Sequence, residues 1–177
     1  MTPEHLRDAA GIAAVFGFFA MSWFGWAQEK PPAPWLRPLR VGSILSGLTA
    51  VGGGLLVWRH WSDGSVIDDR TGPLFGIVVG VEFAAAGLGS GLLAFRKRTD
   101  LMSAWIAFVV GVHLFPVAVI LEIPALHAPA ALITLASIAA VRIARTKSLA
   151  VSAVVGAATG PILLVSAALA LADAFTR

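Results

Sequence analysis

Residues 73–121 read PLFGIVVGVEFAAAGLGSGLLAF, then RKRTD, then LMSAWIAFVVGVHLFPVAVIL. Each apolar run is long enough to cross a hydrocarbon core about 30 Å thick, which needs roughly 20 helical residues. Lipid offers the backbone no hydrogen-bond partner, and neither run alternates apolar and polar residues as a barrel strand does. The stretch therefore predicts two transmembrane helices, and the short polar link between them predicts an antiparallel pair.

The rest of the chain has the same character. It has 177 residues, of which 58% are hydrophobic and 13% charged, whereas a soluble domain carries about 25% charged residues. Its length suggests one compact domain, residues 1–177. We predict an all-α, polytopic integral membrane protein with six transmembrane helices in a compact bundle. The expected spans are residues 9–27, 41–58, 73–95, 101–121, 124–141 and 149–172.

The basic residues predict the orientation of the bundle. Connections 28–40, 96–100 and 142–148 hold nine of the 13 Lys and Arg residues. Basic connections stay on the cytoplasmic side of a membrane, so we expect these three inside the cell and both termini on the outer side of the cell membrane. Because the basic residues are spread between apolar runs, we expect the lipid bilayer as a partner and no nucleic acid.

The first connection is rich in proline, with Pro31, Pro32, Pro34 and Pro38. Proline disfavours helix, so we expect an extended segment over residues 29–40 that lies along the inner membrane surface with Trp35 and Leu36 inserted. A proline-rich ligand for a partner domain is the alternative.

Glu82 and His113 are the most informative residues. At a rise of 1.5 Å per residue, Glu82 lies about 15 Å into its span and His113 about 18 Å into the next, which runs in the opposite direction. Ionisable groups at mid-membrane are costly and usually functional. We expect the two side chains to face one internal site and to share a proton. The alternative is structural: a protonated Glu82 in one interhelical hydrogen bond, and a buried His113 bound to a serine or carbonyl.

Pro116 follows His113 by three residues and cannot donate a hydrogen bond to the Val112 carbonyl. We therefore predict a bend in this span and a polar notch beside His113.

Three further residues are candidates for substrate binding. Glu122 and His127 flank the turn between the fourth and fifth spans, and Thr134 lies on nearly the same helix face as His127. These residues predict either a solvated turn or the outer mouth of a cavity that leads to His113. Together with Glu82 and His113 they form the candidate substrate-binding set.

Glycines mark the packing faces of three spans: Gly52, Gly53, Gly54, Gly76, Gly80, Gly87, Gly89, Gly91, Gly156 and Gly160. Small residues let membrane helices approach closely. We expect most of these faces to pack within the chain, and a homodimer face is the alternative.

Three functions remain open. The first is transport or proton-coupled translocation of a small molecule through the Glu82/His113 site. The second is an intramembrane enzyme, an isomerase, cyclase or lipid-modifying enzyme, that uses the same pair as acid and base on a lipophilic substrate. The third is a non-catalytic accessory or binding subunit. The chain has no cysteine and no metal, haem or phosphate-binding motif, so we expect no cofactor.

Overall fold

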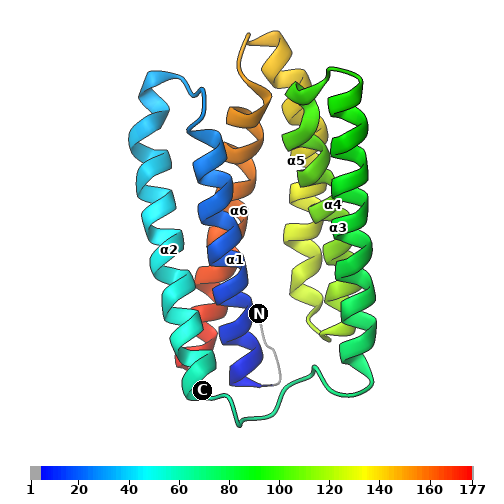
Figure 1. Ribbon diagram of the computed structural model, residues 1–177. Helices are drawn as coiled ribbons and strands as arrows, with labels where there is room; N and C mark the ends of the chain where they lie inside the picture. The colour runs from blue at the N-terminus through cyan, green and yellow to red at the C-terminus, as the bar shows by residue number, and fades with distance from the viewer. Residues whose placement is uncertain (1–4, 177) are drawn as a thin grey trace.

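The computed structural model describes residues 5–176, which form six long helices and no strand (Figure 1). The helices are α1 (Leu6–Ala27), α2 (Leu36–Arg59), α3 (Thr71–Phe95), α4 (Met102–Ile120), α5 (His127–Thr146) and α6 (Val151–Phe175). Three short 3-10 helices precede α2, α4 and α5: η1 (Ala33–Trp35), η2 (Thr99–Leu101) and η3 (Pro124–Leu126). All six long helices have the length and hydropathy to cross a membrane, so the predicted fold class is confirmed.

Successive helices run antiparallel, which sorts the connections to the two ends of the bundle. The α1–α2, α3–α4 and α5–α6 connections lie together at one end, which we call the basic end (Figure 1). The α2–α3 and α4–α5 connections lie at the opposite end, where α1 begins and α6 ends.

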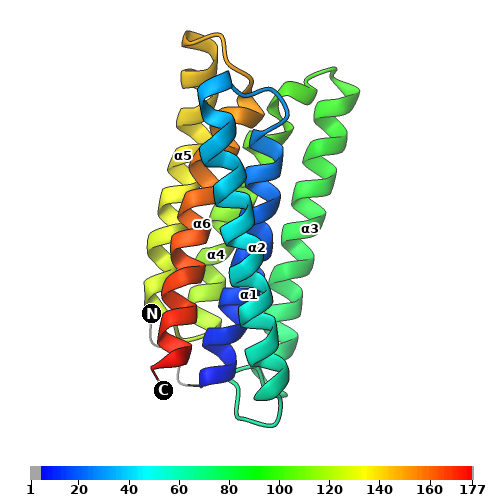
Figure 2. The ribbon, with the colours of Figure 1, turned by 90° about the vertical axis from the view of Figure 1, so that its left-hand side faces the viewer.

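Helices α1, α2 and α6 pack closely against one another, and we call them the tight group. Helix α5 packs against both α4 and α6. Helix α3 packs against α4 at the edge of the bundle (Figure 2). None of residues 71–95 is buried, whereas α1 contributes ten buried residues.

Glycines bring the helices of the tight group into backbone contact. A Cβ atom on Gly17 would lie 2.7 Å from the Ala50 nitrogen, and one on Gly53 would lie 2.7 Å from the Ala10 carbonyl oxygen. Gly156 meets the Trp23 carbonyl and Ala27 in the same way. These are the close approaches that small residues permit in a membrane, where dispersion contacts replace the hydrophobic effect between helices.

The prediction that residues 29–40 form an extended segment is wrong. η1 begins at Ala33 and α2 at Leu36, so residues 36–40 are helical. Pro34 and Pro38 lie in first turns, where backbone N–H groups have no acceptor inside the helix and a missing N–H costs little. Trp35 packs beside Phe24 and Leu39.

The other predicted spans differ from the helices by a few residues, and the ends of α1 at Ala27 and of α3 at Phe95 agree with the prediction. The largest difference is in the fifth span, which was expected at 124–141, whereas α5 begins at His127 and continues to Thr146. Pro124 and the left-handed backbone of Glu122, with φ of 56°, delay its start. Its end extends past Arg142 because a helix can continue beyond the hydrocarbon layer and carry charged side chains into the headgroups.

Candidate functional site

Glu82 of α3 and His113 of α4 lie in contact. The Oε2 atom of Glu82 is 3.3 Å from Nε2 of His113, and the two side chains are 15% and 16% exposed. Both lie near the middle of their helices, so the contact joins two ionisable groups far from either end of the bundle.

The second ring nitrogen of His113 fixes how the pair can hold protons. Nδ1 lies 2.8 Å from the carbonyl oxygen of Val110. A carbonyl can only accept, so Nδ1 carries a hydrogen and donates it. In a neutral imidazole Nε2 is then the acceptor, which faces Glu82. The pair can therefore hold one proton between Oε2 and Nε2, as a carboxylic acid beside imidazole or as a carboxylate beside imidazolium.

Trp105 sets the height of α3 against α4. Its indole Nε1 donates to the Ala85 carbonyl at 3.0 Å, and its ring lies where a side chain on Gly89 would have to go. Ala85 and Gly89 lie on the Glu82 side of α3, within two turns of it. This hydrogen bond could not be predicted from the sequence, because lipid-facing and protein-facing residues are equally apolar and leave no signal of the helix rotations that bring Trp105 against Gly89.

Thr134 belongs to the α4–α5 contact. Its hydroxyl donates to the Ala130 carbonyl at 2.8 Å, and its backbone and side chain lie against Gly111 of α4. Within residues 5–176 no hydrogen bond joins Thr134 to Glu82 or His113.

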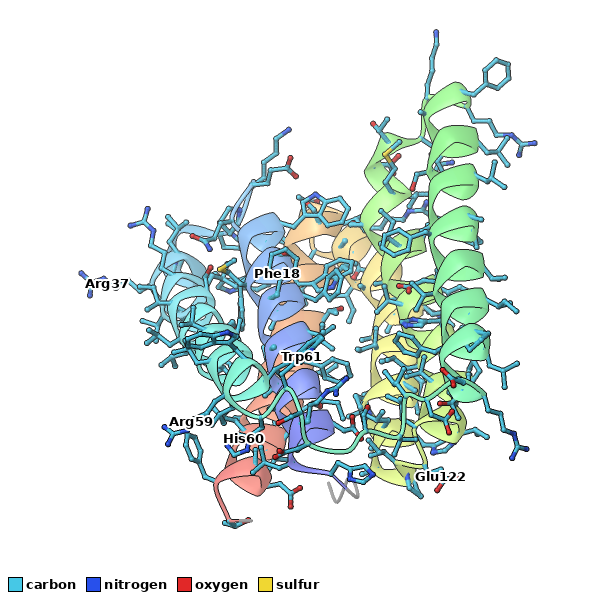
Figure 3. All side chains as sticks on the ribbon, turned by 60° about the horizontal axis from the view of Figure 1, so that its bottom comes forward. Phe18, Arg37, Arg59, His60, Trp61 and Glu122 are labelled. Atoms are coloured by element: carbon cyan, nitrogen blue, oxygen red, sulfur yellow. The ribbon has the colours of Figure 1, made fainter. Side chains whose placement is uncertain are left out.

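Glu122 and His127 lie at the end of the bundle opposite the basic end, in the α4–α5 turn, where Figure 3 labels Glu122. Both are exposed. His127 Nδ1 lies 2.8 Å from the Pro124 carbonyl, and its ring centroid is 5.8 Å from that of Phe115. Among the described residues no hydrogen bond or ion pair links this turn to the Glu82–His113 pair.

Pro116 lies inside α4, which continues as helix to Ile120. Its ring leaves the Val112 carbonyl without its usual donor. The bend at this point stays a prediction.

A polar cluster lies on the α2–α3 connection, which sequence analysis left out. Asp8 of α1 accepts from the Ser65 hydroxyl at 2.6 Å and from the Val66 N–H at 2.8 Å. Arg7 donates to the Trp61 carbonyl at 2.9 Å and lies over the Trp61 ring. We call these contacts the clamp, because they tie the segment that leads into α3 to the first turn of α1.

Asp68 starts α3 from the same connection. Its carboxylate accepts from the N–H groups of Thr71 and Arg70, at 2.8 and 2.9 Å. These backbone donors, that of Thr71 first, hold the pKa of the Asp68 carboxyl below its usual value, which keeps the helix start charged and bonded.

Within residues 5–176 no three His, Cys, Asp or Glu side chains gather as a metal-ligand set would. Comparison of the chain with protein-family models, curated proteins and solved structures finds no match. What the fold defines is an integral membrane protein of six apolar helices.

Proposed function

We propose that this protein moves a small molecule across the membrane in exchange with protons, and that Glu82 and His113 form its proton-exchanging pair. The observation that carries the proposal is the contact of 3.3 Å between Oε2 and Nε2, with Nδ1 of His113 already committed to Val110. Ionisable side chains paired at mid-membrane are typical of proton relays in transporters.

The pair suits proton exchange because its two forms have the same net charge. Two separated ions would each cost several kcal/mol in desolvation, and the neutral pair avoids most of that cost. We therefore expect Glu82 to donate to His113 at rest. A polar substrate or water that enters the site stabilises the ionised form. In that form the Glu82 carboxylate is free to accept a second proton.

The other candidate binding residues take more distant roles in this proposal. Thr134 supports the packing of α5 against α4 near the site. Glu122 and His127, exposed in the α4–α5 turn, are proposed to meet the substrate at the outer membrane surface before it reaches the pair.

The basic end is proposed to be cytoplasmic, because the three connections rich in Lys and Arg share it and such connections are retained inside. The naturally Cys-free chain allows a direct test with the variant Lys97→Cys. An impermeant thiol reagent applied to intact cells should leave it unlabelled, and labelling would reverse the orientation.

An intramembrane enzyme acting on a lipophilic substrate is the second candidate. It is supported by the peripheral position of α3, which has no buried residue and packs on α4. Hydrocarbon therefore surrounds most of the helix that carries Glu82, and a substrate dissolved in lipid has a short path to the acid–base pair.

A homodimer through α3 is compatible with either activity. A Cβ atom on Gly76, Gly80, Gly87 or Gly91 would meet no atom within 4 Å, so this small-residue face is free to pack on a second copy. Disulfide formation between chains carrying Gly80→Cys would support the dimer; its absence in membranes, with Gly54→Cys as the comparison, would argue against it.

The test of the main proposal measures proton binding and transport separately. Infrared spectra of reconstituted protein should contain a protonated carboxyl band that disappears in Glu82→Gln and shifts in His113→Ala. Liposomes with an internal pH dye, challenged with a panel of small organic ions and neutral solutes, should change internal pH for at least one solute. Both variants should lower that rate at least about tenfold, and the double variant should be no slower than either, because the two residues act as one unit.

Glu29→Gln is the matched control, since Glu29 is an exposed carboxyl in the first connection, and it should behave as wild type. Full activity of Glu82→Gln would overturn the assignment and favour an accessory subunit. A product found in the lipid extract, without solute movement, would favour the enzyme.

A further inference from the structure

A groove opens between the first turns of α2 and the middle of α6, toward the basic end. Its volume is about 320 Å³, at the lower end of the range of about 300–1,000 Å³ for small-ligand pockets. Its lining is apolar and comes from three helices and η1: Phe24, Trp35, Pro38, Leu39, Ala157 and Pro161. The groove therefore suits a stretch of hydrocarbon chain, and polar ligands would find no partner inside it.

The local sequence explains why this groove exists. Gly42 and Gly160 both lie against the Phe24 ring, which fills the space between α1, α2 and α6. Ala157 is too small to fill the space beside it, and Pro161 is exposed on the outer face of α6. The groove is thus open toward lipid and closed on its inner side by Phe24.

The end of the groove nearest the headgroups is strongly electropositive. Helices α2 and α6 both begin at this end, with no side-chain cap and no acidic residue in the first turn, so the positive ends of both helix dipoles face the same membrane surface. The adjoining connections, the first turns of α2 and the last turns of α5 add six exposed basic residues, with one acidic residue, Glu29, among them. The basic residues are Lys30, Arg37, Arg40, Arg142, Arg145 and Lys147.

None of these six basic residues forms an ion pair within the described part of the chain. Arg37 and Arg40 flank Pro38 and Leu39 of the groove lining, and Arg37 extends outward from α2 (Figure 3). Trp35 lines the groove at the level where indole rings favour the headgroup region.

From the apolar groove and the unpaired positive charge above it, we propose that this site binds one anionic glycerophospholipid. One acyl chain lies in the groove between α2 and α6. The phosphate lies at the starts of these helices, near Arg37 and Arg40, and the Trp35 ring packs on the upper part of the chain. This site is separate from the Glu82–His113 pair, so either proposal can fail without the other.

The test uses brominated-chain lipids, which quench tryptophan fluorescence on contact. Purified protein in detergent is titrated with brominated phosphatidylglycerol and with phosphatidylcholine that carries the same chains. Subtracting the signal of Trp35→Phe isolates Trp35. Phosphatidylglycerol should quench Trp35 at lower concentration by about 30-fold, because each surface Arg or Lys adds about fivefold to the affinity for an anionic lipid.

Two variants separate the groove from the charges. Ala157→Phe should fill the groove and remove Trp35 quenching by both lipids, whereas Val165→Phe, at an exposed position further along α6, should change nothing. Arg37→Gln combined with Arg40→Gln should leave quenching by phosphatidylcholine unchanged and abolish the preference for phosphatidylglycerol. Equal quenching of the wild type by both lipids would reduce the site to an uncharged chain contact and overturn the proposal, as would undiminished quenching in Ala157→Phe.

Discussion

Helices α1 and α3 have similar length and apolar composition but opposite roles in the bundle. Helix α1 has ten buried residues and meets α2 and α6 in backbone contact, at Gly17, Gly53 and Gly156. Helix α3 has none, and four of its glycines face open space. Because lipid is as apolar as the helices, packing depends on how closely backbones approach, and α1 lies at the centre of these close approaches.

The same difference separates the helices that stabilise the bundle from a helix that carries part of the candidate site. The candidate site lies on the loosely held helix, where α3 is attached through Glu82, through the Trp105 hydrogen bond and through the clamp on its preceding connection. Regions that move in function are drawn from the less stable parts of a structure. We therefore expect α3 to shift against α4 more readily than α1, α2 and α6 move against one another.

The largest expected effect is a loss of stability in Gly53→Leu, which disrupts the close packing of α2 against α1. A Cβ atom there would lie 2.7 Å from the Ala10 carbonyl oxygen, and two backbones cannot yield as a side chain would. We expect a loss of about 3 kcal/mol or more in unfolding free energy, at or beyond the upper end of overpacking effects, measured by denaturation in mixed micelles.

Gly54→Leu is the matched control, because the next residue along α2 has no atom within 4 Å of its Cβ position. Its unfolding free energy should equal that of the wild type. Equal stability of the two variants would contradict the central position of α1.

Gly53 and Gly54 also show which features of this structure could not be predicted from the sequence. The six helices followed from the length of the apolar runs, since a bilayer permits no other spanning structure here. Depth along antiparallel helices put Glu82 and His113 at one level, and the two are in contact; their function stays a prediction. The rotation of each helix could not be predicted, because lipid-facing and protein-facing residues are equally apolar. Neighbouring glycines, one buried and one open, therefore look identical in the sequence.

Loosening the clamp should have an intermediate and local effect. In Asp8→Ala, the Ser65 hydroxyl and Val66 N–H lose a charged acceptor. Hydrogen bonds to charged groups contribute about 1.5–3 kcal/mol, and partial exposure places the expected loss near the lower limit. Amide hydrogen exchange should speed up about tenfold at Val66 and the start of α3, with α1 beyond its first turn unchanged.

The control is Asp69→Asn, because Asp69 is an exposed carboxyl on the same connection. Uniform acceleration in α1 and α3 would mean that the clamp stabilises the whole bundle.

The smallest expected effect on stability is the one closest to the site. Trp105→Phe keeps an aromatic ring over Gly89 and removes the hydrogen bond of 3.0 Å to the Ala85 carbonyl. Interhelical hydrogen bonds in membranes contribute about 0.6 kcal/mol on average, so unfolding should hardly change. The height of α3 against α4 should change, because no other polar contact besides the Glu82–His113 pair joins these helices within residues 5–176. The protonated carboxyl band of Glu82 should therefore broaden and shift in Trp105→Phe, and α3 amides should exchange faster while α1 amides do not.

Trp58→Phe is the control, since Trp58 is 77% exposed on α2. If the band keeps its position and width in Trp105→Phe, the Glu82–His113 contact is held by helix packing alone, and α3 is more firmly fixed than its exposed surface indicates.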